Sequence, residues 1–467
     1  MINAFEELMR VRGLEDEPSV SITGSDPIYE TRFRVAETGA AILAANGVAV
    51  SDIWKLKTGR SDAVSVDARH AAAALASANH LEFKQADGSY VPMRDSTLAQ
   101  QAYATIAPYH TKDDRLFMPH FGMAHMKAKV LEILGCDFNP QSIGKAVAKW
   151  TAEDLDRAIA EANCCGGIVR TEEEWLAHPH GQALTAQAVV EIEKIGESDP
   201  EPFLTDGPPL AGIRVLDLTR ILAGPVAART LGEYGADVLM IGADHVPQIK
   251  KFVIDLSHGK RSCYLDMRDA AEAEALKTLV KDADVFSQGY RPGALEGKGF
   301  GPEELAALRP GLIYTSINCY GSGGPFSDRA GWEQIAQTVT GISHENGLDH
   351  GGFPELLPVY FTDYGTGYLG AYGTMLALAR RAREGGSYHV KVSLCQTGMM
   401  LQRQGRVENP KEAKSLSPEE VIALQQTSKT SYGDIRHLAP LVRYTEIQPR
   451  YAGPSPALGS SAPVWLQ

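Results

Sequence analysis

The segment YFTDYGTGYLG, residues 360–370, places one acid, Asp363, at the end of a short apolar and aromatic run. Gly365 and Gly367 follow it, and then a stretch with the pattern of a helix. Glycine lets the backbone approach a ligand closely, so that backbone amides can stabilise a developing oxyanion. A carboxylate in this position has two roles open to it. It caps the helix that begins near Tyr364, or it acts as a nucleophile.

The composition restricts the class of ligand. The chain has 467 residues, 44% of them hydrophobic and 22% charged, which is typical of a globular protein with two to four domains. A formal net charge of -13 argues against a nucleic-acid or membrane partner. The six cysteines lack metal-ligand spacing, so we expect no metal site. With no signal-like start and no long apolar run, we expect a cytoplasmic protein.

The first half of the chain has mainly helical patterns. We expect a helix over residues 32–48, a strand running into a helix over 62–78, and a helix over 116–136. A further helix is expected from Thr151, an N-cap residue, to about residue 169.

Residues 196–211 are rich in proline, glycine and acidic residues, and we interpret them as a linker. The pattern of predicted elements changes after this stretch. Short β-rich runs then alternate with helical patterns as far as Tyr320. This alternation predicts an α/β fold with a parallel, Rossmann-like sheet, whose ligands lie at the carboxyl ends of the strands. We expect the polar, Pro-rich tail, residues 403–467, to wrap the surface.

Four stretches resemble the class III CoA-transferases, a family that includes formyl-CoA and carnitine CoA-transferases and α-methylacyl-CoA racemase. They are residues 212–241, 259–269, 290–325 and 330–343, in the family's order. The resemblance implies a Rossmann-like large domain, a smaller α+β domain and an interlocked homodimer. It also implies acyl-CoA and a small carboxylic acid as substrates, with no covalently bound cofactor.

In that family the acid at the position of Asp363 is the nucleophile, which attacks the thioester to form a mixed anhydride and then an aspartyl-CoA thioester. Glu333 and Tyr320 are further catalytic candidates, although a helix-end acid and a half-buried aromatic residue are the structural alternatives. The resemblance also places a set of residues against CoA, namely Arg220, Ile221, Leu222, Ala223, Lys260, Arg261, Tyr290 and Lys298. For Lys260 and Arg261 a solvated pair is the alternative.

Several positions depart from the family pattern. Gly242 and Ala243 stand where an acid and a base usually contact the nucleotide, and Gly289 replaces an asparagine near the pantetheine path. Trp332 and Glu333 stand where racemases have a His-Asp pair, and tryptophan cannot carry a proton at neutral pH. We therefore predict CoA transfer. The alternatives are a relative with isomerase, racemase-like or other acyl chemistry, and a non-catalytic scaffold.

The order of the segments differs from that of the family. Residues 148–184 resemble the end of the small domain, yet they precede the large domain, and residues 59–75 echo 385–401. In this first copy the stretch matching the catalytic acid falls near residues 29–35, without a convincing aspartate, so we expect one active site per chain. The predicted units are a degenerate back-half segment that packs on the large domain (1–105), a small domain (106–195), the linker (196–211), a catalytic domain (212–402) and the tail (403–467).

Overall fold

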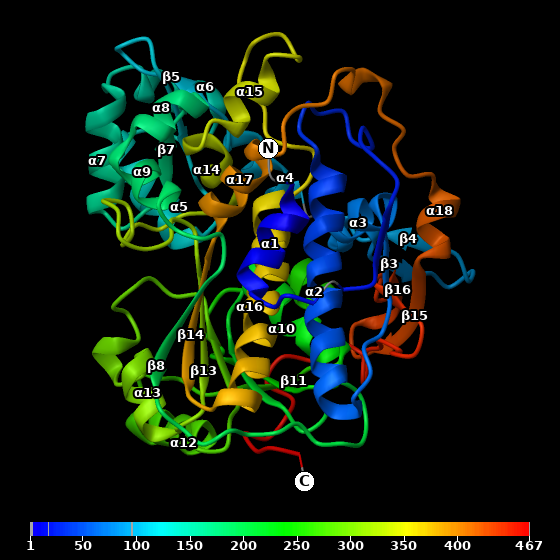
Figure 1. Ribbon diagram of the computed structural model, residues 1–467. Helices are drawn as coiled ribbons and strands as arrows, with labels where there is room; N and C mark the ends of the chain where they lie inside the picture. The colour runs from blue at the N-terminus through cyan, green and yellow to red at the C-terminus, as the bar shows by residue number, and fades with distance from the viewer. Residues whose placement is uncertain (1–2, 17, 95–96, 467) are drawn as a thin grey trace.

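A seven-stranded sheet forms the centre of the molecule (Figure 1). The computed structural model describes residues 3–16, 18–94 and 97–466. In spatial order the strands are β11 (Arg261–Tyr264), β10 (Asp237–Gly242), β9 (Arg214–Leu218), β12 (Val285–Gln288), β13 (Ile313–Asn318), β14 (Ser387–Ser393) and β8 (Glu191–Gly196). All pair in parallel except β8, which is antiparallel to β14. The predicted parallel α/β sheet is confirmed.

Helices cover both faces of this sheet. They are α10 (Ala223–Glu233), α11 (Lys250–Leu256), α12 (Ala270–Val280), α13 (Pro302–Leu308), α16 (Phe361–Glu384) and α17 (Leu394–Arg403). Side chains alternate along a strand, so Val215 of β9 joins the core beneath α10 and α16, while Leu216 joins a second core with α12 and α13. The strands and helices expected between residues 212 and 320 are all present, and α11 is an addition to them.

A smaller α+β unit lies at the upper left of Figure 1. Its antiparallel sheet consists of β5 (Tyr109–His110), β6 (Leu116–Pro119) and β7 (Gly166–Ile168). Its helices are α5 (Ala124–Leu134), α6 (Pro140–Val147), α7 (Ala152–Glu161), α8 (Glu172–Ala177) and α9 (Pro179–Thr185). The cap at Thr151 is present, and its side chain accepts from Asp154 N at 3.2 Å. The helix predicted over residues 116–136 is wrong in its first part, which is β6 and pairs with β7.

Two further helices link this unit to the large sheet. They are α14 (Glu333–Val339) and α15 (Ile342–Gly347), and α14 packs against β7 and α17. The predicted boundary between small domain and linker, at residues 195 and 196, falls inside β8. The chain therefore enters the large sheet before the linker begins.

The two ends of the chain combine into a third part, at the right of Figure 1. Its N-terminal elements are α1 (Ala4–Arg12), β1 (Val20–Thr23), α2 (Val35–Thr58), β2 (Val64–Asp67), α3 (Ala68–Ala74), β3 (Glu82–Lys84), β4 (Tyr90–Pro92) and α4 (Thr97–Thr105). Its C-terminal elements are α18 (Pro418–Ala423), β15 (Gln425–Thr430), β16 (Gly433–Leu438) and β17 (Arg443–Tyr444). β16 pairs with β3, and β17 pairs with β2, so the tail is built into sheets rather than only wrapped around the surface.

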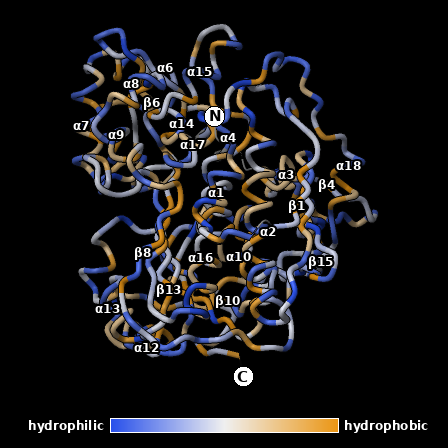
Figure 2. The backbone as a smooth tube through the Cα atoms, viewed as in Figure 1, coloured by the Kyte–Doolittle hydropathy of each residue, from blue (hydrophilic) through white to orange (hydrophobic). Residues whose placement is uncertain are grey.

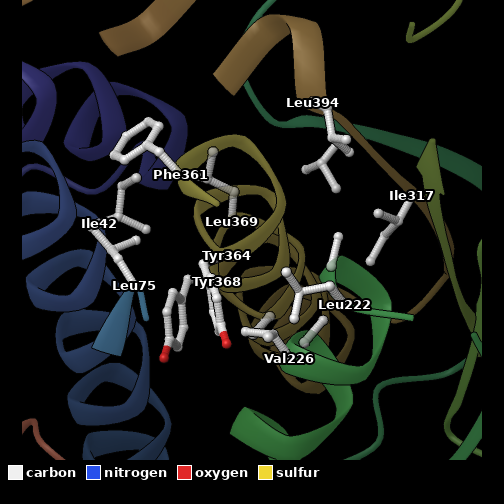
Figure 3. Packing of buried hydrophobic residues seen from close by; sticks show 14 of the residues in the cluster. Ile42, Leu75, Leu222, Val226, Ile317, Phe361, Tyr364, Tyr368, Leu369 and Leu394 are labelled. Carbon is white, nitrogen blue, oxygen red and sulfur yellow. The ribbon is translucent and has the colours of Figure 1, made fainter. Parts of the chain in front are cut away.

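Helix α16 is the element that all three parts share. It packs on both α10 and α2, and one buried cluster runs through the N-terminal segment, the small unit and the large sheet. Figure 3 shows its aromatic residues between two groups of aliphatic side chains, Ile42 and Leu75 on one side and Leu222, Val226 and Ile317 on the other. Apolar residues concentrate on the central strands and inner helices, and hydrophilic residues along the outer loops (Figure 2).

A buried ion pair closes the base of the loop between β9 and α10. Lys260 Nζ lies 2.8 Å from Asp217 Oδ2, and neither side chain is exposed. The same ammonium donates to Pro225 O at 3.0 Å, and Asp217 accepts from Thr219 N at 3.0 Å. The pair thus fixes both ends of the segment from 219 to 225.

Replacing one partner of this pair should destabilise the fold. In a Lys260→Met variant Asp217 keeps its charge in a buried position without its counter-ion, which typically costs about 3–5 kcal/mol. Urea denaturation should show a loss of free energy of unfolding in that range. The matched control is Lys298→Met at an exposed position, which should change stability by less than about 0.5 kcal/mol. Equal, small effects of the two variants would contradict a structural role for Lys260.

Candidate functional site

The acid at the start of α16 is not its N-cap. The helix begins at Phe361, and the preceding residue, Tyr360, makes no side-chain capping hydrogen bond. The apolar and aromatic run before Asp363 is not a strand, and Asp363 is the third residue of the helix rather than the residue before it. The capping group comes from a distant element. Glu333, the first residue of α14, accepts from Thr362 N at 3.2 Å and from Asp363 N at 2.5 Å.

Two acids thus lie together at one helix end. Glu333 is 2% exposed, and its carboxylate also accepts from Thr362 Oγ1 and Gln337 Nε2, both at 2.5 Å. Burial raises the pKa of Glu333, and the hydrogen bonds from Thr362, Gln337 and the backbone of Asp363 oppose that rise. Burial and the neighbouring Glu333 charge raise the pKa of Asp363 well above its usual value. Asp363 is therefore the more basic of the two carboxyl groups.

A first cleft, of about 240 Å³, opens at the carboxyl ends of β9, β12 and β13 and reaches Asp363. We call it the loop cleft. Five of the residues predicted to contact CoA line it, namely Arg220, Ile221, Leu222, Ala223 and Tyr290. It also contains Arg291 and Arg329, which the sequence reasoning had not selected. Arg291 follows β12 directly, so the rule that ligands bind at strand ends is a signal that would have found it.

A second cavity, of about 500 Å³, is also lined by Asp363. We call it the inner cavity. It shares Asp363, Trp332, Ile221 and Leu222 with the loop cleft. Ile221 has a φ of 75°, in the left-handed region that β-branched residues rarely adopt. This strained loop residue and Asp363 thus stand between two separate spaces.

Gly367 has a packing role. A Cβ at Gly367 would lie 2.4 Å from Ala223 O, so the missing side chain lets α16 pack tightly against the start of α10. A Cβ at Gly365 would lie 2.8 Å from a methyl group of Thr397 in α17. These glycines position Asp363 against the loop at residues 219–225, which corrects the interpretation that they open backbone to the ligand.

Four predicted site residues line neither cavity, namely Lys260, Arg261, Lys298 and Tyr320. Lys260 is buried in its ion pair with Asp217, and Arg261 pairs with Asp237 at 2.8 Å and donates to the tail at Val464 O. These contacts correct the expectation that the two cations meet phosphates. Lys298 is exposed in a short 3-10 turn.

Tyr320 belongs to the interface with the small unit. It is 1% exposed, its backbone oxygen lies 2.7 Å from His180 Nε2, and its ring packs edge-on against Phe326. Its side chain lines neither cavity, whereas the adjacent Cys319 lines the loop cleft.

Helix α2 repeats the geometry of α16. Both helices have 24 residues, and both follow a residue of the same backbone conformation, Arg34 (φ -79°, ψ 63°) and Tyr360 (φ -80°, ψ 60°). The third residue of α2 is also an acid, Glu37, at the position that Asp363 has in α16. Each helix is followed by a strand that runs directly into another helix. The predicted echo is thus part of a longer repeat.

The repeated helix end has a different charge arrangement. Asp26 accepts from Ala36 N at 3.3 Å and from Glu37 N at 2.9 Å, as Glu333 does in α16. Glu37, however, is paired with Arg34 at 2.8 Å. Glu37 is therefore the residue of the first copy that corresponds to Asp363. It lies just beyond residues 29–35, the stretch that the sequence matched to the catalytic acid, and it is paired with Arg34.

Two classes of feature are absent from the described ranges. No group of three or more His, Cys, Asp or Glu side chains there could hold a metal ion. Within the same residues, no helix is long and apolar enough to cross a membrane.

Comparisons with known proteins show the family of the chain. Residues 210–421 match the model of CoA-transferase family III. The acetyl-coenzyme A transferase nodX of Hypoxylon pulicicidum is 32% identical over 416 residues, covering 80% of this chain and 70% of that protein. The human succinyl-CoA:glutarate CoA-transferase is 35% identical over 190 residues, covering 38% of this chain and 43% of that protein.

Among solved structures, a CAIB/BAIF family protein from Brucella suis is similar with 30% identity and a TM-score of 0.39, covering 49% of this chain and 65% of that one. The similarity to the fungal transferase over most of both chains and the family match over the large domain identify the relationship. The chain belongs to CoA-transferase family III, and it is a CoA-transferase.

Proposed function

We propose that the chain transfers CoA from an acyl-CoA donor to a carboxylic acid, with Asp363 as the covalent nucleophile. The observation that carries the proposal is the place of Asp363, between a cleft that contains arginines and a separate cavity. A CoA thioester extends naturally across such a junction, with its CoA part in the loop cleft and its acyl group in the inner cavity.

The chemistry proceeds in balanced steps. A carboxylate oxygen of Asp363 attacks the thioester carbonyl carbon, the C–S bond breaks, and the CoA thiolate leaves a mixed anhydride. The thiolate attacks the aspartyl carbonyl of this anhydride, which releases the donor acid and leaves an aspartyl-CoA thioester. The acceptor carboxylate then attacks that thioester and displaces the thiolate. Attack of the thiolate on the acceptor carbonyl finally releases acyl-CoA and the Asp363 carboxylate.

The surroundings of Asp363 suit this role. A poorly solvated carboxylate is a stronger nucleophile than one surrounded by water, and burial beside Glu333 raises the pKa of Asp363 in the same way. The position at a helix N-terminus supports the ionised form once it has formed. Glu333 thus orients the helix end and makes Asp363 more basic.

The anionic groups of CoA have local cations available despite the net charge of the chain. Arg220 is exposed at the rim of the loop cleft. Arg291 donates to Asn163 at 2.6 Å, and Arg329 to Asp156 at 2.6 Å, which holds both guanidinium groups in place. These arginines support CoA binding in place of Lys260 and Arg261, and they argue against a non-catalytic scaffold. A cytoplasmic homodimer stays a prediction from sequence, and light scattering would test the dimer.

Replacing Asp363 with Asn should abolish transfer while the fold survives. The free energy of unfolding should change by about 1 kcal/mol or less, because an acid in the first turn gains only that much from the helix dipole. The neutral amide cannot form the anhydride, so turnover should fall by about 10³-fold or more. Mass spectrometry after incubation with acyl-CoA should find a hydroxylamine-sensitive CoA adduct on the wild-type peptide that contains Asp363.

The repeat in the chain supplies a matched control. Glu37→Gln makes the equivalent change at the third residue of α2, where Arg34 already neutralises the acid. This variant should keep turnover within about twofold of wild type and should still form the adduct at Asp363. Loss of activity in Glu37→Gln, or normal turnover in Asp363→Asn, would contradict the assignment of Asp363 as the one nucleophile.

The pH dependence should report the coupling of the two acids. Asp363 must be ionised to react, and its pKa is raised, so single-turnover acylation should increase as pH rises through that raised pKa. Glu333→Gln removes the charge that contributes to the shift and keeps an oxygen for the helix amides. Its acylation profile should move to lower pH, with helical circular dichroism unchanged. A profile that stays in place, or moves to higher pH, would show that Glu333 does not set the pKa of Asp363.

A further inference from the structure

We infer that the inner cavity binds a monocarboxylic acid with a sizeable apolar body, a medium-chain or ring-bearing acid, with its carboxyl group at Asp363. This inference rests on the proposed function and names its substrate class. The first argument is position. The cleft with the arginines is suited to the CoA part, and the inner cavity is the other space among the described residues that reaches Asp363.

The second argument is the chemistry of the wall. The side chains that form it are mainly apolar or aromatic, among them Met93, Ile106, Leu222, Phe252, Trp332 and Tyr360. Ile106 and Phe252 are each 8% exposed, and Leu222 is 1% exposed. The volume of about 500 Å³ is larger than a two- or three-carbon acid requires. An acid that fills more of it would bury more apolar surface.

The third argument concerns charge. His120 on the inner wall is 1% exposed, and burial lowers its pKa to about 4, so its ring is neutral. It stacks on Trp332 with ring centroids 4.8 Å apart. Glu333, on the same wall, is the more acidic member of the carboxyl pair. A second carboxylate close to Glu333 would meet its negative charge, whereas the cations that line the cavity are exposed or half-buried, which disfavours short dicarboxylic acids.

Three cations, Arg94, Lys250 and Lys251, also line the cavity. Arg94 and Lys250 are exposed, and Lys251 donates to Asn79 Oδ1 at 2.9 Å. Exposed charges attract an anion in water without binding it tightly. They would draw an acid toward the cavity against the net charge of -13.

The specificity residues come from outside the family segment. Met93 and Ile106 flank α4 in the N-terminal part, whereas the family match covers residues 210–421. The size of the acid is therefore set by the N-terminal part of this chain, which supplies one wall of a cavity whose reactive group belongs to the large domain.

A panel of acceptors tests the inference. With acetyl-CoA as donor, the new thioester is measured by mass spectrometry for propanoate, hexanoate, octanoate, succinate and glutarate. Each buried CH₂ group is worth about a fourfold gain, so kcat/KM should rise steeply from propanoate to octanoate. Octanoate should exceed glutarate by about tenfold or more. Equal values along the series, or a preference for the dicarboxylic acids, would overturn the inference.

A variant pair ties the preference to the cavity wall. Ile106→Trp fills part of the cavity and should lower kcat/KM for octanoate at least about tenfold more than for propanoate. The control is Ile422→Trp in α18, where the side chain is 47% exposed, and this variant should leave both values unchanged. Equal losses for the two acids in Ile106→Trp would overturn the assignment of this wall.

Binding without reaction separates the inference from the proposed function. Calorimetry of octanoate with the Asp363→Asn variant measures the cavity alone. Saturable octanoate binding that Ile106→Trp weakens in the Asp363→Asn background would support the cavity assignment, even if no CoA transfer were found. Transfer to succinate or propanoate without octanoate binding would leave the proposed function standing and overturn the inference.

Discussion

The hydrogen bonds from the start of α16 to Glu333 are the constraint on which the site depends. They attach the long, largely buried helix α16 to α14, which packs on the small unit, so the distance between the helix end and the small unit is fixed. They also satisfy backbone amides that would otherwise be buried without partners. Their cost is a second carboxylate beside Asp363, and the donors around Glu333 offset that cost. The structural cap and the proposed nucleophile are thus separate residues at one helix end.

The tight packing of α16 against α10 and α2 explains why these helices contain so many small residues. At Gly367 any side chain would meet Ala223 O, and at Gly39 of α2 a Cβ would lie 2.7 Å from Leu75. The repeat of α16 in α2 brings the same capped helix start to two places in the chain. In α2 the pairing of Glu37 with Arg34 neutralises the acid, so geometry alone does not make this position reactive. The difference between the two sites is their electrostatics.

Local patterns in the sequence predicted the large sheet and the order of its strands and helices, whereas the resemblance to the family pointed to Asp363 and to the loop from 219 to 225. These features depend on residues that are near one another in the chain. What the sequence could not show depends on distant partners. Lys260 looks like a solvated cation until Asp217 is placed beside it, and the cap of α16 comes from a residue thirty positions earlier. The place of Met93 and Ile106 in the wall of the inner cavity could be found only from the folded structure, because no sequence motif joins them to Asp363.

The displaced order of the halves has a consequence for how specificity is divided. The loop cleft, the proposed site of the CoA part, is built mainly from the family segment. The inner cavity takes a wall from the N-terminal part, which is outside that match. Substitutions there would change the shape of the proposed acid site without disturbing the helix end or the arginines. A half-copy whose own acid is paired with Arg34 would therefore keep a function, because it shapes the space in front of the proposed nucleophile.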